Sequence, residues 1–199
     1  MDLRERILRA AAVVFAEEGF RGATTRRIAR EAGVNEITLF RHFGSKERLL
    51  MEACVVADVE APGPTLPAEP GRPRAELRAW ARQHMALLLE KRSFIRTCMA
   101  EVGEHPEMMP PGNRTVRTMI DLRGYLQRLK DRRLTTAPFD PAIAAPMLMG
   151  VLFADAMGRD VMPGLFANEP EEAIDQYVDL FLRGIGLKAA QPKTRERAS

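Results

Sequence analysis

The sequence contains few of the residues that catalytic and metal centres use. Its 199 residues include two cysteines and three histidines. Cys54 and Cys98 fit no metal-binding or redox spacing, so we expect two free thiols in a reducing cytosol. The chain has no Gly-x-Ser-x-Gly elbow, His-Glu-x-x-His pair, phosphate-binding P-loop or Cys-x-x-Cys pair. We therefore predict that the protein is not an enzyme and holds neither a metal nor a cofactor.

Long apolar runs and secretion signals are also missing. The longest run without a charged residue, 141–154, is too short to span a bilayer and contains Pro146 and Gly150. The first ten residues mix charged and apolar side chains, unlike a signal peptide. These features predict a soluble, cytoplasmic protein that does not enter a membrane.

No stretch alternates apolar and polar residues for long enough to indicate a β-strand. Apolar residues make up 46% of the chain, a globular composition, and they recur at helical spacing. Proline-rich stretches at 61–73 and 105–112 interrupt this pattern. The fold class is predicted to be all-α, with helices at about 2–18, 25–32, 35–41, 46–60, 74–92, 94–104, 113–134, 140–157 and 170–187.

The segment from Thr24 to Leu50 has the pattern of a helix-turn-helix. Thr24 supplies a hydroxyl just before a helical run, where it is expected to cap the helix. Gly33 ends that run because glycine adopts the left-handed conformation at little cost. Asn35 then begins a second short helix, whose outer face is free to enter the major groove of DNA.

This segment resembles the N-terminal signature of the TetR family of transcriptional regulators. The resemblance covers residues 3–52 and rests on Thr24-Thr25, Ile28-Ala29, Ala32-Gly33-Val34, Thr38-Leu39-Phe40, His42-Phe43, Lys46-Glu47 and Leu49. It implies a three-helix, helix-turn-helix DNA-binding domain at 1–46 and a larger helical ligand-binding and dimerisation domain at 47–187. Composition adds a disordered basic tail at 188–199.

The resemblance also implies which residues bind DNA. Phosphate contacts fall on threonines, a histidine and a lysine, and base contacts on side chains of suitable hydrogen-bonding character. Phe40 stands where the family often has tyrosine, and the missing hydroxyl lowers the binding free energy by about 1 kcal/mol. The alternative for the arginines is simple solvation of a helix face. The predicted set is Thr24, Thr25, Arg26, Glu36, Ile37, Thr38, Phe40, Arg41, His42 and Lys46.

Charge is distributed unevenly along the chain. Residues 1–50 and 188–199 each carry a net charge of +3, whereas residues 51–187 carry −3. A basic N-terminal segment suits a nucleic-acid-binding end, although an excess of three charges is small.

The helical domain at 47–187 is predicted to dimerise and to bind a ligand. The helices at 140–157 and 170–187 are apolar on more faces than a small core needs, which favours a homodimer; the alternative is that they form the monomer core. Methionines and aromatic residues suit a cavity for a small hydrophobic effector, or else they simply fill the core. The candidate pocket residues are Trp80, His84, Met85, Phe94, Met99, Met119, Tyr125 and Met147.

The function that follows is a ligand-responsive, sequence-specific DNA-binding transcriptional regulator. We expect a repressor that acts as a homodimer on a palindromic double-stranded operator and is released by its effector. Two alternatives belong to other classes: a small helical enzyme with an incidental helix-turn-helix, and a helical module that binds a protein instead of DNA.

Overall fold

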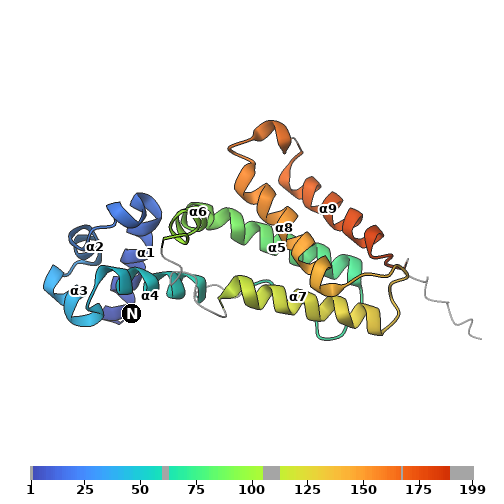
Figure 1. The fold of residues 1–199 in the computed structure, drawn as a ribbon, viewed down its shortest axis with the longest axis horizontal. Coiled ribbons are helices and arrows are strands. Elements are labelled where there is room, and N and C mark those ends of the chain that lie inside the picture. Colours follow the sequence, from blue (N-terminus) through green and yellow to red (C-terminus); the bar gives the residue numbers. More distant parts are fainter. Residues whose placement is uncertain (1, 60–62, 105–112, 167, 189–199) are drawn as a thin grey trace, which may run out of the picture. The chain divides into compact units, whose positions relative to one another are not determined.

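The computed structural model describes residues 2–59, 63–104, 113–166 and 168–188. Its regular structure in these ranges is helical, apart from one isolated antiparallel bridge between Thr135 and Leu187, so the predicted all-α fold class is confirmed. The chain forms two compact units, Met1–Gly63 with Met85–Thr118 and Pro64–His84 with Met119–Ser199. Figure 1 labels the helices that build each unit.

The first unit begins with α1, Leu3–Gly22, which packs against α2, α4 and α6. Its apolar stripe is buried at Ile7, Leu8, Ala11, Val14 and Phe15. Gly19 has a φ of 70° inside this helix, directly after residue 18, where the sequence predicts the helix end, and a further turn continues to Gly22.

Capping residues set the ends of α2, Thr25–Ala32, and α3, Glu36–Phe43. The Thr24 hydroxyl accepts from the Arg27 backbone N–H at 3.2 Å, and the Asn35 side chain accepts from the Thr38 N–H at 2.9 Å. Gly33 has φ 64° and ψ 38° between the two helices, the left-handed geometry that the turn requires. The helix-turn-helix predicted from the sequence is therefore present.

The remaining helices of this unit complete its core. The Ser45 hydroxyl accepts from the Arg48 N–H at 3.2 Å and caps α4, Lys46–Val59, which buries Leu49 and Leu50. Phe94 on α6, Arg92–Glu101, meets Phe15 edge to face with 5.8 Å between ring centroids.

The second unit contains the start of α5, Pro73–Glu90, and most of α7, Arg114–Asp131. Glu76 joins these helices, because its carboxylate accepts from the Tyr125 hydroxyl and from the N–H groups of Gly71 and Arg72. Burial and this hydrogen bond raise the pKa of Tyr125 well above its ordinary value. The core around them contains Leu77, Trp80, Leu122, Leu126 and Leu129.

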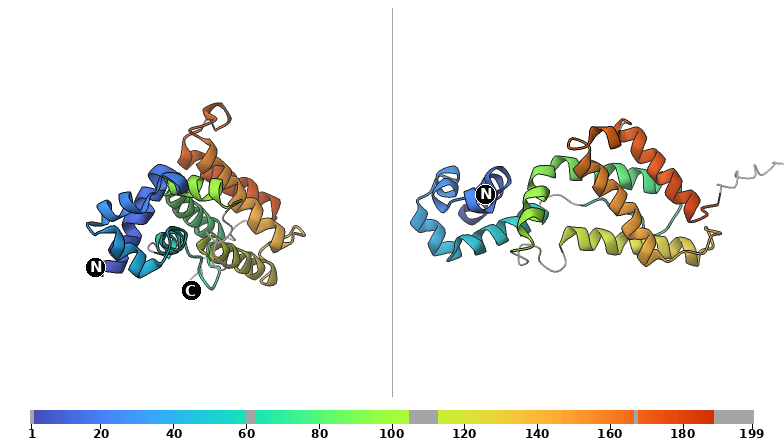
Figure 2. Two further views of the ribbon diagram at one scale, coloured as in Figure 1. Left: turned by 60° about the vertical axis from the view of Figure 1, so that its left-hand side comes forward. Right: turned by 45° about the horizontal axis from the view of Figure 1, so that its top comes forward.

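The last two long helices, α8 (Pro141–Gly158) and α9 (Pro170–Gly184), lie side by side in the second unit (Figures 1 and 2). A 3-10 turn, η2 (Pro163–Leu165), lies between them in the chain. Asp140 caps α8 by accepting from the Ala142 N–H at 2.8 Å, and Pro141 occupies the first helical position, where proline is favoured. Asp155, fully buried on α8, accepts from Arg159 and from the Tyr177 hydroxyl of α9, each at 2.8 Å.

The apolar composition of α8 has two consequences. Among the described residues it is the one helix long and apolar enough to cross a membrane, with a mean hydropathy of 1.5. Half of the helix is buried within the protein, which is also the pattern of a core helix in a globular protein. Its other face is exposed at Ile143 and Met147.

Two predictions fall on segments that the structure leaves out. The proline-rich break at 105–112 and the basic tail, from residue 189 onward, lie outside the described residues. The division at residue 46 into a DNA-binding and a regulatory domain stays a prediction, since the two compact units are defined by packing alone.

Candidate nucleic-acid interface

A tightly packed core supports the two helices of the helix-turn-helix. Ile28 and Ala29 of α2, together with Leu39 and Phe43 of α3, are at most 4% exposed. Val34, in the turn, packs against the same core. The outer surface of α3 is therefore held on a support that cannot shift without disturbing the core.

The outward face of α3 carries apolar residues that no part of the first unit covers. Ile37 is 71% exposed and Phe40 48% exposed, and Arg41 is exposed beside them. Spacings of three and four residues put these side chains on one face of the helix. Such a face offers apolar contacts and a guanidinium together, a combination suited to thymine methyl groups and guanine edges.

Hydrogen bonds orient the polar residues at the two helix starts. The Thr25 hydroxyl donates to the Glu36 carboxylate, a contact between α2 and α3 that sequence reasoning did not anticipate. The Thr38 hydroxyl donates to Asn35 Oδ1 at 3.0 Å. Glu36 is thus oriented by a neighbour from the other helix before any DNA binds.

Unpaired cations surround this face. Within the described ranges, Arg26, Arg30 and Arg41 form no ion pair and are exposed. Arg27, by contrast, is held by Glu17, Glu18 and Glu31 and has a structural role. The surface of α2 and α3 therefore keeps free positive charge available for phosphates.

The two remaining predicted phosphate contacts lie at the end of α3 and the start of α4. His42 is exposed, with its ring 6.1 Å from that of Phe43. Lys46 Nζ lies 4.8 Å from the centroid of the Phe20 ring and donates to the Arg21 carbonyl at 3.4 Å. This ammonium group is thus held near the C-terminal end of α1.

The predicted ligand-pocket residues are divided between the two units. In the second unit, Trp80 stacks on His84 with 5.2 Å between ring centroids, and Tyr125 is fully buried. The same unit contains Met119 and Met147. The first unit contains Met85, which is buried, Phe94, which packs on α1, and Met99, which is half exposed.

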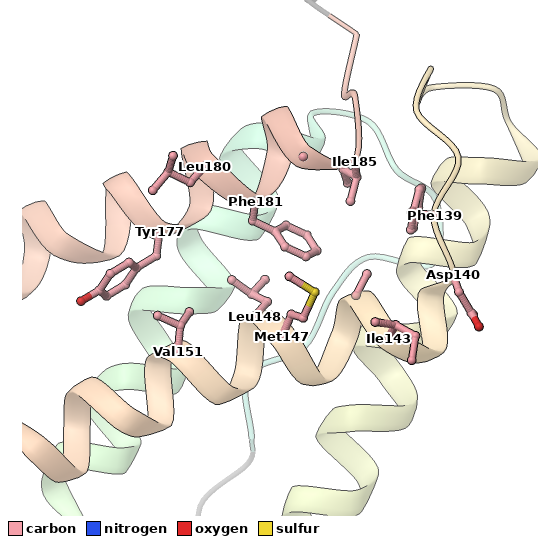
Figure 3. A pocket seen from close by; sticks show the side chains of 12 residues that line it. Phe139, Asp140, Ile143, Met147, Leu148, Val151, Tyr177, Leu180, Phe181 and Ile185 are labelled. Atoms are coloured by element: carbon pink, nitrogen blue, oxygen red, sulfur yellow. The ribbon is translucent and has the colours of Figure 1, made fainter.

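A separate apolar groove runs between α8 and α9 within the second unit. Its volume is about 550 Å³, and Met147 is the member of the predicted pocket set that lines it. Figure 3 shows the Phe181 ring directed toward α8, where Met147 and Leu148 lie. Hydropathy indicated that these helices are apolar, but only their packing shows that a groove stays open between them.

The site and fold together define a class of protein, an all-α protein with an N-terminal helix-turn-helix followed by further helices. Comparison with known proteins narrows this class. Residues 7–53 match the family model described as bacterial regulatory proteins, tetR family. The repressor AcnR of Corynebacterium efficiens is 44% identical over 51 residues, which are 26% of this chain and 27% of AcnR. The chain matches such curated relatives over between 18% and 29% of their length.

Solved structures are similar over nearly the whole chain. A transcriptional regulator from Mesorhizobium loti MAFF303099, assigned to the TetR family, has a TM-score of 0.72 at 23% identity and covers 93% of this chain and 97% of its own. The flavonoid-responsive regulator FrrA has a TM-score of 0.68 at 25% identity and covers 94% and 98%. Residues 7–53 therefore match the N-terminal domain of the tetR family, and the fold of the whole chain is similar to that of TetR-family regulators. The relatives are named transcriptional regulators, which are not enzymes, in agreement with the prediction.

Proposed function

We propose that the protein is a ligand-responsive transcriptional repressor that binds a palindromic operator as a homodimer. The observation that carries the proposal is the outward face of α3, where Ile37, Phe40 and Arg41 are exposed over a packed core. Exposed apolar groups beside an unpaired guanidinium suit the base edges of a major groove. The name of AcnR as a repressor supports the sign of regulation, and the cytoplasm is the compartment that a DNA-binding regulator of bacteria requires.

The groove between α8 and α9 supports the homodimer. Met147 is 64% exposed and Leu180 60% exposed, and Ile143 is equally open, so both helices present apolar side chains outward. Buried Asp155 bonds to both helices through Arg159 and Tyr177 and holds them as one rigid pair. A second copy of the same two helices, related by a two-fold axis, would cover both apolar faces at once. A second copy in this position also explains why half of the apolar helix α8 lies outside the core of the single chain.

An effector site within the helical body is supported by Trp80. Its side chain is buried, yet among the described residues its indole N–H has no hydrogen-bond acceptor. A buried donor without an acceptor is costly, and a ligand oxygen would relieve that cost. FrrA is named flavonoid-responsive, so a small aromatic effector has a precedent among the structural relatives. An effector that binds one of two conformations better shifts the population and releases DNA.

Selection from a random duplex pool tests DNA binding. The purified protein, shown to be folded and dimeric, is incubated with the pool at about 0.15 M ionic strength, and the bound fraction is sequenced. Enrichment of a palindrome is the expected result, since two copies of α3 would contact two half-sites. If ligand-free protein enriches no sequence, the helix-turn-helix does not recognise DNA and the proposal fails.

Three variants separate base recognition from charge. Glu36→Ala should relax the base preference at one position of each half-site, whereas Lys46→Ala should weaken all sequences alike and reduce the salt slope by about 1. Arg123→Ala is the matched control, because Arg123 is exposed on α7 and carries the same charge. A protein-binding module would show no salt-dependent DNA binding for any of these proteins.

The effector hypothesis has an intrinsic probe, because Trp80 is the single tryptophan of the chain. Titration with flavonoids and other small aromatic compounds should quench or shift its fluorescence with saturation, and the same compounds should release the selected operator. A compound that releases DNA without affecting Trp80 would exclude this residue from the effector site.

A further inference from the structure

The second unit contains another cavity, strongly basic, which does not take part in the DNA-binding face or in the apolar groove. Its volume is about 760 Å³, and three segments of the chain form it, 70–78, 132–134 and 187–188. No acidic residue is among the described residues that line it. We call it the basic cavity, and its cations are Arg72, Arg74, Arg78, Arg132, Arg133 and Lys188.

Three of these cations are paired with acids just outside the cavity. Asp179 accepts from Arg74 at 2.6 Å and from Arg78 at 2.8 Å. Burial opposes ionisation of Asp179, but the hydrogen bonds and charges of the two arginines prevail and hold its pKa below the ordinary value. Arg132 pairs with Glu69. These ion pairs fix the positions of the three arginines in the cavity wall and neutralise part of their positive charge.

The other three cations have no such compensation. In the part of the chain that the structure describes, the side chains of Arg72, Arg133 and Lys188 form no ion pair and no hydrogen bond. Arg78 adds a buried Nε that lacks a hydrogen-bond partner. Two carboxylates pair with three of the six cations, so the cavity holds a surplus of about four positive charges in a concave site. Field lines are focused there, and an anion is attracted more strongly than at a convex surface.

The backbone that presents the free cations is itself anchored. Arg133 has a φ of 55°, the left-handed conformation that glycine usually occupies after a helix. Its N–H donates to the Lys130 carbonyl and the Leu134 N–H to the Leu129 carbonyl, each at 2.9 Å, which completes a Schellman motif. The Lys188 N–H donates to the Leu134 carbonyl at 3.0 Å. The Arg72 N–H donates to the Glu76 carboxylate at 2.6 Å, so all three cations project from hydrogen-bonded backbone.

We propose that the basic cavity binds a phosphorylated small molecule of diphosphate or triphosphate charge. Guanidinium groups present paired donors that match phosphate oxygens, and charge-assisted hydrogen bonds of this kind are strong. The surplus charge matches a diphosphate or triphosphate better than a single phosphate. The volume also falls in the range of small-molecule sites, about 300–1,000 Å³, and leaves room for an organic group beside the phosphates.

Calorimetric titration with inorganic pyrophosphate tests this proposal without reference to DNA binding, so it stands or falls separately from the proposed function. At about 0.15 M ionic strength the intact protein should bind one pyrophosphate per chain with saturation. The variant Arg72→Gln/Arg133→Asn should bind about tenfold more weakly or worse. Neither substitution leaves a carboxylate unpaired, and asparagine tolerates the left-handed conformation at position 133.

The matched control is Arg123→Gln, which removes an exposed arginine of α7 that does not line the cavity. Circular dichroism and Trp80 fluorescence verify the fold of each variant. Unchanged affinity in Arg123→Gln, with weakened affinity in the double variant, is the supporting result. Absence of saturable binding, or equal weakening by both variants, would overturn the proposal.

A competition experiment separates a small-molecule site from a DNA contact. Binding of random-sequence duplex DNA is measured for the intact protein and for the double variant, in the presence and absence of pyrophosphate. If the double variant weakens DNA binding but leaves pyrophosphate affinity intact, the arginines serve the DNA backbone and the proposal is wrong. Adenosine diphosphate in place of pyrophosphate then tests whether the cavity accepts the organic group.

Discussion

Replacement of Asp155 by alanine tests whether the α8–α9 pair depends on one buried carboxylate. Asp155 is 0% exposed and accepts two hydrogen bonds from Arg159 and one from the Tyr177 hydroxyl, all at 2.8 Å. These contacts raise the pKa of Arg159 above its ordinary value, the hydrogen bond to Asp155 being the largest cause. Asp155→Ala removes all three bonds and the buried carboxylate that pairs with Arg159.

The expected loss is set by what Arg159 and Tyr177 retain. Removing one partner of a buried ion pair typically costs about 3–5 kcal/mol. The Arg159 side chain is 18% exposed and still donates to the Phe166 carbonyl at 3.0 Å and to the Asn168 carbonyl, so the lower end applies. We expect Asp155→Ala to lower the free energy of unfolding by about 3 kcal/mol, and Tyr177→Phe by about 1 kcal/mol.

Urea unfolding at fixed protein concentration measures both effects. Trp80 fluorescence is the appropriate probe, because Trp80 lies in the same compact unit as Asp155. The double variant completes a cycle, in which the two losses should not add, since both remove the Asp155–Tyr177 bond. A loss below about 1 kcal/mol for Asp155→Ala, comparable to a surface substitution, would refute the reasoning.

Three further predictions concern association, pH and thiol chemistry. Met147→Glu should convert the dimer into monomers in analytical ultracentrifugation, whereas Met99→Glu, also at an exposed methionine, should not; a Met147→Glu dimer would contradict the proposed interface. Burial and the hydrogen bond to Asp155 raise the pKa of Tyr177 to about 12. The neutral Tyr177 hydroxyl therefore stabilises the folded protein fully below about pH 10, and this stabilisation is lost as pH rises through 12. Tyrosinate absorbance that appears at the ordinary pKa in the native protein would disprove this. Contact with the Cys98 thiol at 4.0 Å and burial raise the pKa of Cys54. Iodoacetamide should therefore modify Cys98 before Cys54, which peptide mass spectrometry can follow. Equal rates of modification would be inconsistent with the structure.

Local chemistry explains why the helix boundaries were predictable. Thr24, Asn35, Ser45 and Asp140 each accept a backbone N–H at a helix start, as their short polar side chains favour. Gly33 adopts the left-handed turn between α2 and α3. Each of these interactions joins residues at most four positions apart, so the sequence alone contains the information.

Contacts between distant residues could not be predicted in the same way. The Thr25–Glu36 bond, which orients a predicted base contact, joins two helices across the turn. The pairing of Arg74 and Arg78 with Asp179 joins residues about a hundred positions apart. The ligand-pocket set was inferred from residue type, and the structure assigns its members to two packing units. Their role in ligand binding stays a prediction.

The amino-acid sequence by itself determined the all-α fold and the helix-turn-helix, because caps, glycines and helical periodicity act over a few residues. Tertiary structure alone decided which charges are free. Arg27 and Arg26 are neighbours in the sequence, yet three glutamates hold Arg27, and no acidic residue in the described part of the chain pairs with Arg26. The same holds for the basic cavity, where Arg72 and Arg133 come together from segments about sixty residues apart. Charge compensation depends on distance in space, and only the packed chain sets those distances.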